Sequence, residues 1–243
     1  MNAFIDLPHV ELDGITLTQS YFQSILNTAG DISLKEMSDF LFEELPYLWR
    51  ADYVGMTQRK TDIRKISANS FTYIYDDYAS LEIKGYVTYS NVMESRVVGV
   101  VGKSEQHNKL REISRLNKWV GPTESIYGKC WDKGHFIAHK SGGLVDGHEL
   151  NVFIQRRDLN RGWSEAGKRF RAMEKYCSNN VGTFCFIRPI YLNETSQPAF
   201  FEYGVLRSTK DLWVELFDNR LDCCASKWRY FFLSLFDSLN MKL

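Results

Sequence analysis

Two neighbouring stretches, WDKGHFIAHKSGG (residues 131–143) and NVFIQRRDLNRGW (residues 151–163), carry the strongest pattern in this chain. The first is a short apolar run with His135 behind an Asp-Lys-Gly step. Because Gly134 has no side chain, another backbone or a ligand can approach a strand closely there. We expect a strand around His135, a second extended piece at 150–154, and a helix after Asn160. This order of elements is a ββα outline.

The residues that follow predict further elements of an antiparallel sheet. Residues 165–177 have the pattern of a helix. The β-rich runs at 183–192 and 199–206 flank the turn residues NETSQP and predict a hairpin, with 212–217 as a further edge strand. Residues 226–240 repeat apolar side chains at helical spacing, which predicts an amphipathic helix packed on the sheet.

Upstream of the quoted stretches, the pattern changes from helical to extended. Residues 33–45 predict a helix behind a serine cap, and we expect Pro46 to end it. Its apolar face would contain Leu34, Met37, Leu41 and Leu45. Residues 70–102 alternate apolar and polar side chains, beginning with Phe71, Tyr73 and Tyr75, and predict a meander of strands. Residues 105–118 predict a polar helix.

Composition places these elements in one ordinary globular domain, residues 1–243. Apolar residues make up 44% and charged residues 25% of the 243 positions. No run approaches the ~20 apolar residues of a membrane helix, and the N-terminus lacks the pattern of a secretory signal. We therefore expect a cytoplasmic protein, or one exported without a cleaved signal peptide, and no membrane partner. The expected class is α+β, with a central antiparallel sheet and flanking helices.

Charge is balanced overall but unevenly distributed. The 30 basic and 30 acidic residues give a net charge of zero. Residues 1–55 contain nine acidic residues against Lys35 and Arg50, and they form an acidic N-terminal extension. Residues 156–175 contain seven basic residues against three acidic ones. Because a polyanion responds to local charge, the second segment is the expected contact for nucleic acid.

The residue types at 132–174 suit phosphodiester hydrolysis. A histidine with a pKa near neutrality is able to deprotonate water. An asparagine carbonyl is able to hold a hydrated Mg²⁺ without neutralising it, and Mg²⁺ stabilises charge on phosphate. Arginines bind phosphate as a two-pronged fork. His135, Asn160 and the arginines around Asn160 supply these types.

The pattern resembles the DNA/RNA non-specific endonucleases of the ββα-metal nuclease superfamily. Their signature is D-R-G-H, then N-x-x-P-Q-x-x-x-x-N, then a tryptophan and a glutamate on the next helix. This chain has Asp132-Lys133-Gly134-His135, then Asn151, Gln155 and Asn160 at the family's spacing, then Trp163. The resemblance covers about residues 127–207, the expected ββα-metal core and the hairpin after it. The first hundred residues show no family match.

The resemblance implies a role for each matching residue. His135 would be the general base, and Asn160 the direct protein ligand of Mg²⁺, for which Mn²⁺ would substitute. Arg161 would act with them at the phosphate. The residues expected to bind substrate are Lys133, Arg156, Arg157 and Arg169. The residues expected to shape the site are Asp132, Asn151 and Gln155.

The chain departs from the family at three positions. Lys133 replaces an arginine and Ile154 replaces a proline. The family's glutamate falls on Lys168, which leaves Glu165 and Glu174 as candidates. If residues 163–168 are an insert and the helix begins near 168, Glu174 returns to the site and is catalytic, the alternative we favour. If the helix runs unbroken from 162, Glu174 lies too far from Asn160.

Other readings of the same residues compete with this one. Cys130, His135, His139 and His148 invite a zinc site, but they lack the two close pairs that structural zinc sites usually have. His139, at i+4 from His135, would reach the same strand face and contact phosphate. The five cysteines form no CxxC pair and are expected to be free thiols.

The sequence therefore predicts a Mg²⁺-dependent endonuclease that hydrolyses DNA, RNA or both. The alternatives are a non-catalytic nucleic-acid- or protein-binding domain on a ββα scaffold, and a sequence-specific HNH-type endonuclease. Such a nuclease needs restraint, which favours a toxin or defence effector held by an inhibitor or immunity protein. The acidic residues 1–55 are expected to cover or gate the basic groove, to carry a surface that a partner recognises, or merely to extend the core.

Overall fold

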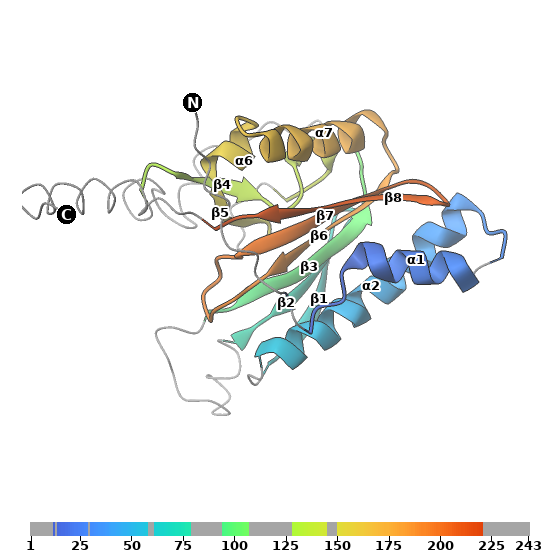
Figure 1. The fold of residues 1–243 in the computed structure, drawn as a ribbon, viewed down its shortest axis with the longest axis horizontal. Helices are drawn as coiled ribbons and strands as arrows, with labels where there is room; N and C mark the ends of the chain where they lie inside the picture. Colours follow the sequence, from blue (N-terminus) through green and yellow to red (C-terminus); the bar gives the residue numbers. More distant parts are fainter. Residues whose placement is uncertain are drawn as a thin grey trace, which may run out of the picture.

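A six-stranded antiparallel sheet forms the centre of the protein (Figure 1). The computed structural model describes residues 12, 14–28, 30–57, 61–78, 94–106, 128–144 and 150–220. In spatial order the strands are β1 (Ile63–Ala68), β2 (Phe71–Asp76), β3 (Arg96–Lys103), β6 (Phe184–Ile190), β7 (Phe200–Ser208) and β8 (Asp211–Asp218). Every neighbouring pair is antiparallel. The α+β class, the hairpin at β6–β7 and the edge strand β8 are confirmed.

Both faces of this sheet are covered, so its inner strands β2, β3, β6 and β7 are buried on both sides, whereas the edge strands β1 and β8 are more exposed. Phe71, Tyr73 and Tyr75 of β2 belong to the core on one face, whereas Ile74 belongs to the core on the other. The alternation expected from the sequence is thus confirmed. Burial does not alternate, however, because all six β2 residues are buried. Such strands are typical of a sheet between two covering layers.

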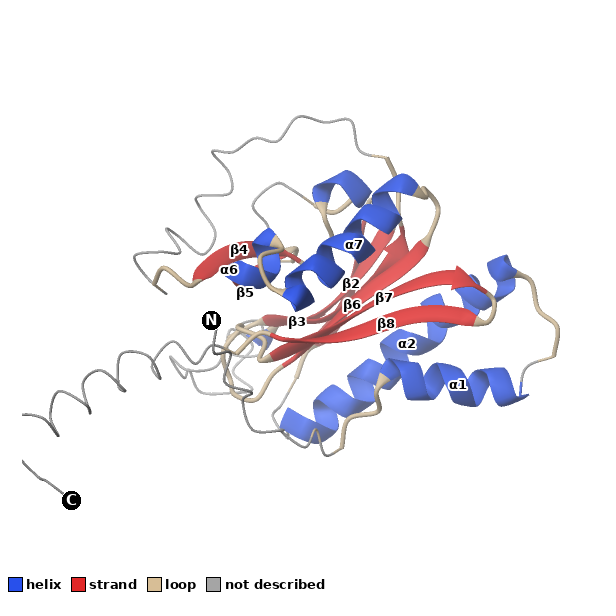
Figure 2. Ribbon diagram, turned by 45° about the horizontal axis from the view of Figure 1, so that its top comes forward, coloured by secondary structure: helices blue, strands red, loops and turns tan. Residues whose placement is uncertain are grey.

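Helices α1 (Thr18–Thr28) and α2 (Leu34–Thr57) cover one face (Figures 1 and 2). The inward stripe of α2 repeats at every fourth residue, and all its members are buried: Met37, Leu41, Leu45, Trp49 and Tyr53. Leu34, expected on this face, is 47% exposed. The indole of Trp49 lies over Gly99 in β3, where an added Cβ would meet the ring. This close approach fixes the helix against the centre of the sheet.

The expected end of this helix at Pro46 is wrong, although its expected start is confirmed. Ser33 accepts a hydrogen bond from the Glu36 backbone N–H, and the Ser33 N–H donates to the Glu36 carboxylate, so the two form a capping box. The helix continues through Pro46 to Thr57. A proline inside a helix costs about 3 kcal/mol. Burying the side chains of Trp49 and Tyr53 beyond it stabilises by about 1.5–3 kcal/mol each and outweighs that cost.

A buried ion cluster joins α1 and α2 to the sheet. The Arg188 guanidinium on β6 contacts Glu202 at 3.3 Å and Asp52 at 2.7 Å. Glu202 in turn accepts hydrogen bonds from the backbone N–H and the hydroxyl of Thr18, where α1 begins. Side-chain exposure is 4% for Arg188, 2% for Glu202 and 12% for Asp52. This Arg188 cluster links three segments that are far apart in the chain.

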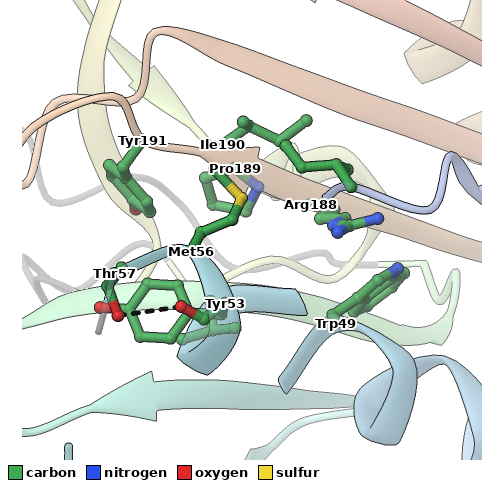
Figure 3. Close-up of a pocket in the computed structure, with 10 residues that line it drawn as sticks. Trp49, Tyr53, Met56, Thr57, Arg188, Pro189, Ile190 and Tyr191 are labelled. Carbon is green, nitrogen blue, oxygen red and sulfur yellow. Dashed lines mark hydrogen bonds between the residues drawn. The ribbon is translucent and has the colours of Figure 1, made fainter. Parts of the chain in front are cut away.

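Beside the Arg188 cluster lies a cavity of about 20 Å³ (Figure 3). Figure 3 shows residues of α2 facing residues of β6 across it, among them Trp49, Tyr53, Met56, Arg188, Pro189 and Ile190. A space of this size holds about one water molecule. It is therefore too small for a larger ligand.

The described part of the acidic N-terminal segment extends the core on the face opposite to the quoted stretches. Its described part from residue 14 onward contributes α1 and most of α2, and supplies Phe22, Leu41 and Trp49 to the core on that face. The quoted stretches at 131–163 lie on the opposite face (Figure 2). The gating hypothesis is therefore wrong for residues 14–55, because a sheet separates them from the candidate site. Deleting them would expose the core.

The second layer contains a small two-stranded sheet and two helices. Strand β4 (Trp131–His135) pairs antiparallel with β5 (Val152–Arg156), and helices α6 (Arg157–Arg161) and α7 (Glu165–Asn179) follow. A 3-10 turn, η1 (His139–Ser141), lies between the strands. Phe170 of α7 packs edge-on against Phe201, Tyr203 and Phe217 of the large sheet, with ring centroids 5.4–5.5 Å apart. The helix expected at 165–177 is confirmed.

Several expectations fall wholly or mostly outside the described residues. They are the helix at 105–118, the middle of the 70–102 meander, the amphipathic helix at 226–240, and the cysteines at 223 and 224. Across the part of the chain that is described, no helix is long and apolar enough to span a membrane. Cys130, Cys177 and Cys185 are free thiols.

Candidate functional site

The β4–β5 pairing brings the two quoted stretches together. In the register of this small sheet, Asp132 lies opposite Gln155 and His135 opposite Val152. The chain then turns directly into α6, where the Arg157 N–H donates to the Cys130 carbonyl at 2.8 Å. The short helix therefore begins beside the start of β4. Side chains from both stretches meet there.

Asp132 is the centre of this meeting point. Its carboxylate accepts hydrogen bonds from Arg157 Nε at 2.9 Å and from Arg161 Nε and Nη2 at 2.6 and 3.1 Å. The Arg161 contact is two-pronged, the geometry that suits a guanidinium and a carboxylate. We call Asp132, Arg157, Arg161 and the neighbouring Asn160 the Asp132 cluster. Asp132 thus positions both arginines expected at the phosphate.

The pKa of Asp132 lies below its ordinary value. Burial by itself raises the pKa of this carboxyl, but the hydrogen bonds from Arg161 and Arg157 lower it further than burial raises it. The carboxylate is therefore charged at neutral pH. With two cationic arginines around it, this part of the cluster has an excess of one positive charge.

Asn160 adjoins Asp132 from the last turn of α6. Its amide nitrogen lies 3.4 Å from Asp132 Oδ2 and 3.5 Å from the Lys133 carbonyl oxygen. Both contacts use the nitrogen, so among the described residues the carbonyl oxygen makes no hydrogen bond. The residue is half-buried. An oriented, partly exposed carbonyl oxygen is a suitable donor for a hard cation.

Lys133 adds a further positive charge beside the Asp132 cluster. It is half-buried on β4, and burial lowers the pKa of its ammonium group below the ordinary value. It follows Asp132 directly, so its side chain leaves the strand on the other side. The sequence expectation that Lys133 binds substrate stays a prediction.

Asn151 fixes the loop after β4. Its carbonyl oxygen accepts from the Ile137 N–H at 2.9 Å, while its amide nitrogen donates to the carbonyls of Ile137 and Leu144 at 2.9 and 2.6 Å. Gly143 lies against the same amide, where an added Cβ would come within 3.0 Å. The fully buried Asn151 side chain therefore holds both ends of the 137–144 loop, as expected of a residue that shapes the site.

The Gln155 side chain fills the space beside Gly134, between strands β4 and β5. The side chain is fully buried and lies against Gly134, where an added Cβ would be 2.6 Å from the Cβ of Gln155. Within the described residues, neither polar atom of its amide has a hydrogen-bond partner. The glycine in the Asp-Lys-Gly-His step is thus required for packing of the two strands, in agreement with the expected close approach.

His135 ends β4, and His139 does not share its strand face. His135 is half-buried, with its Nε2 atom shielded from solvent. The strand stops there because the chain turns at residues 136–138 into η1, which begins at His139. The i+4 argument for His139 is therefore wrong, since it required a continuous strand. His139 itself is 8% exposed.

The helical segment after β5 is interrupted between Asn160 and the two candidate glutamates. Gly162 adopts a left-handed conformation (φ 70°) and ends α6, and Ser164 caps α7 by accepting the Gly167 N–H at 3.0 Å. Both starting points weighed for the glutamate are therefore wrong, because α7 begins at Glu165, as the helical pattern at 165–177 predicted, and neither near 168 nor at 162. Gly167 lies inside α7, close to the backbone of α6 at Asp158. It allows the two helices to pack closely.

The two candidate glutamates differ in their surroundings. The Glu165 side chain is 79% exposed and pairs with Lys168 on the first turn of α7. The Glu174 side chain is 11% exposed and pairs with Arg171 at 2.8 Å. Burial raises the pKa of the Tyr203 hydroxyl most, followed by the thiols Cys177 and Cys185, and the negative charge of Glu174 raises it further. No hydrogen bond or ion pair within the described residues joins either glutamate to the Asp132 cluster.

Two arginines expected to bind substrate are engaged elsewhere. Arg156 pairs with Asp158 at 2.8 Å and donates to the Asp218 carbonyl at the end of β8. Arg169 pairs with Glu215 on β8 at 3.2 Å. Arg156 therefore joins α6 to the large sheet. Asn219, which the sequence did not indicate, adds to this junction by accepting the Arg156 N–H and donating to the Ile154 carbonyl.

Trp163 stands at the break between α6 and α7 and is 63% exposed. The Arg161 guanidinium lies over its indole, 5.0 Å from the ring centroid. The family resemblance places a tryptophan on the helix; here it lies in the turn before α7. The aromatic ring is thus connected to the Asp132 cluster through Arg161.

The donor atoms suit Mg²⁺ better than zinc. Among the described residues, no group of three or more His, Cys, Asp or Glu side chains is placed to hold a metal ion, although His148 of the zinc hypothesis lies outside them. Mg²⁺ keeps several of its waters and needs only one or two protein oxygens. The Asn160 carbonyl oxygen fits that requirement.

A search of protein-family models and of curated proteins finds no match to this chain.

Proposed function

We propose that this protein is a Mg²⁺-dependent endonuclease that hydrolyses phosphodiester bonds of DNA, RNA or both. The observation that carries the proposal is the Asp132 cluster. The motif's two halves meet there, because Arg157, Asn160 and Arg161 on α6 each lie within hydrogen-bond distance of Asp132 on β4. The resemblance to the DNA/RNA non-specific endonucleases assigns these positions to one active site.

The arginines bind the scissile phosphate in this proposal. Asp132 carries one negative charge, and Arg157 and Arg161 carry two positive charges, so these three side chains have a net charge of +1. Arg161 is 47% exposed on its side chain, which leaves it accessible to a ligand. The excess positive charge attracts a polyanion and stabilises the extra charge of the transition state.

Asn160 holds the metal and His135 accepts the proton. When bound, hydrated Mg²⁺ stabilises negative charge on the phosphate and the leaving oxygen. Asp132 orients Asn160 through the amide nitrogen, which directs the carbonyl oxygen away from Asp132. His135, three residues after Asp132, takes the proton of the attacking water. We retain Glu174 for the waters of the metal because its carboxylate is enclosed, whereas that of Glu165 is open to solvent.

Plasmid DNA and a structured RNA, each incubated with the full chain and either Mg²⁺ or a chelator, test the proposal. We expect Mg²⁺-dependent degradation to short fragments. His135→Ala should lower the rate by about 10²–10⁴-fold, the usual effect of losing a general base. Asn160→Ala should raise the Mg²⁺ concentration needed for half-maximal rate. Lys168→Ala, an exposed position on α7, is the matched control and should cleave normally. Activity of His135→Ala within a few-fold of wild type would refute the assignment.

A second candidate is a nucleic-acid-binding protein without catalysis. The net positive charge around Asp132 favours phosphate binding whether or not His135 acts. Under this alternative the wild-type chain binds nucleic acid in a salt-dependent way and degrades none of it in Mg²⁺. The same incubations, followed by a binding assay, separate the two candidates. Discrete DNA fragments would instead indicate the sequence-specific HNH-type alternative.

A further inference from the structure

Trp163 is held in an exposed position by the turn between α6 and α7. Gly162 ends α6, and the Trp163 N–H donates to the Asp158 carbonyl at 2.8 Å. Ser164 then caps α7. The backbone on both sides of the tryptophan is therefore fixed by hydrogen bonds, while 63% of the residue faces solvent. By contrast, Trp49 is fully buried in the core.

One arginine lies over this indole, and a second lies beside the turn that holds it. Arg161 lies over the ring at 5.0 Å and binds Asp132 with the same guanidinium. Arg171 lies against Gly162, the residue before Trp163, where an added Cβ would be 3.1 Å from its Cγ. An exposed aromatic ring flanked by arginines suits a ligand that has both a flat ring and a negative charge. Nucleotides have both.

We propose that Trp163 is a stacking platform for an unpaired nucleobase, and that the preferred substrate is single-stranded nucleic acid. This inference rests on the proposed function, because it names the substrate class of the same site. Stacking of a base on an aromatic side chain contributes about 1–3 kcal/mol and requires an exposed base face. In a duplex the faces are stacked on neighbouring pairs, and only the edges are accessible in the grooves. A rigid indole beside the phosphate site therefore strengthens binding of an unpaired strand but not of a duplex.

A protein partner is the other class of ligand that an exposed tryptophan suits. The surroundings favour nucleic acid. Arg161 lies over the indole and also contacts Asp132, so the ring adjoins the proposed phosphate site. Tryptophan and arginine are both common in protein interfaces, so this connection to the phosphate site, and not the arginine alone, favours nucleic acid.

Binding of matched oligonucleotides tests the platform in the His135→Ala background, which prevents cleavage. The probes are a single strand without self-complementarity and the duplex of the same sequence, each followed by anisotropy and by quenching of tryptophan fluorescence. Trp163→Ala should weaken single-strand binding by about 10- to 100-fold, the range that corresponds to the stacking energy. Trp163→Phe should restore most of that loss, and duplex binding should change by less than about 3-fold.

Trp213→Phe is the matched control. Trp213 on β8 has an arginine, Arg207, over its ring at the same 5.0 Å, but it packs against the core and makes no contact with the Asp132 cluster. Its replacement should leave both probes bound as before. Equal loss of single-strand and duplex binding in Trp163→Ala, or no loss of either, would overturn the platform.

Failure of the platform and failure of the nuclease proposal give different results. If the wild type degrades nucleic acid but Trp163→Ala leaves the ratio of single-strand to duplex cleavage unchanged, the platform is wrong and the nuclease stands. If the wild type degrades nothing, yet single-strand binding depends on Trp163, the platform stands without catalysis. If Trp163→Ala weakens binding of a protein partner but leaves binding of both oligonucleotide probes unchanged, the platform is wrong.

Discussion

Two arginine–carboxylate clusters lie on opposite faces of the large sheet, and they are built in opposite proportions. The Arg188 cluster has one arginine between two carboxylates, Glu202 and Asp52, and is almost completely buried. The Asp132 cluster has one carboxylate between two arginines, Arg157 and Arg161, and is partly open to solvent. The Arg188 cluster therefore has an excess of negative charge, and the Asp132 cluster an excess of positive charge.

The difference indicates which cluster is closed to solvent. The excess negative charge around Arg188 is met by the first residue of α1, where Thr18 donates two hydrogen bonds to Glu202. A helix N-terminus carries partial positive charge and stabilises the buried carboxylates further. The Asp132 cluster is more open, since the Arg161 side chain is 47% exposed. This exposure suits the phosphate contact that we propose for Arg161.

The largest expected effect is on stability, from Arg188→Met. Removing the guanidinium leaves Glu202 and Asp52 buried without their cation, which usually costs about 3–5 kcal/mol. Urea unfolding followed by circular dichroism measures the loss. Arg207→Met, which removes an exposed pair with Asp211, is the control and should cost less than about 1 kcal/mol. Equal effects of the two variants would remove the distinction between buried and open clusters.

Asp132→Asn should have an intermediate effect that depends on pH. Hydrogen bonds to charged groups contribute about 1.5–3 kcal/mol each before solvent screening, so we expect a loss of about 1–3 kcal/mol at neutral pH. The pKa of Asp132 is lowered in the folded protein, so its contribution is fully present above the ordinary value of about 3.9 and disappears as pH falls through the lowered value. The stability difference between wild type and variant should therefore shrink in acid. A difference that stays constant down to strongly acidic pH would contradict the charged role of Asp132.

Arg161→Ala should separate stability from binding. Its side chain is 47% exposed, so the loss of its pair with Asp132 should cost no more than about 1 kcal/mol. If it contacts phosphate, the variant in the His135→Ala background should bind oligonucleotides more weakly, and the slope of log affinity against log salt should fall by about one. An unchanged salt slope would place the phosphate elsewhere.

Arg169→Ala should have the smallest effect of the series. Its guanidinium pairs with Glu215 on β8 in an exposed contact, so stability should change by less than about 0.5 kcal/mol. We expect little change in the salt slope, in contrast to Arg161→Ala. A drop of the same size as for Arg161 would extend the phosphate-binding surface along α7, as the sequence alone suggested.

Patterns that extend over only a few residues of the sequence correctly predicted several strands and turns. The alternation of Phe71, Tyr73 and Tyr75 and the hairpin of β6 and β7 were predicted because period-two spacing and turn residues act over a few positions. The end of α2 was not, because the local effect of Pro46 is outweighed by burial of Trp49 and Tyr53 against a sheet that comes later in the chain.

At the candidate site, the same limit applies to long-range contacts. The spacing of Asp132, Gln155 and Asn160 predicted that the two stretches belong to one site, but it placed a helix only after Asn160, whereas Asn160 lies inside α6. Asp132 as the common partner of Arg157 and Arg161 was not predicted, since pairing depends on the register of the two strands. The helix break carried a usable signal, a glycine at 162 followed by a serine cap at 164, which neither of the two starting points weighed for the glutamate used.

The order of strands in the large sheet has a consequence for how the chain folds. Strands β1, β2 and β3 are consecutive neighbours, as are β6, β7 and β8, but β3 pairs with β6 across the whole segment that carries the candidate site, with Val100 opposite Ile187. Each set of three strands, β1–β3 and β6–β8, is able to form early, because its pairings close short loops. The β3–β6 pairing closes a much longer loop, has a higher entropic cost, and is expected to form later. Newly made protein would therefore pass through a state in which two half-sheets are formed and unjoined, with the unpaired edges of β3 and β6 exposed to other chains.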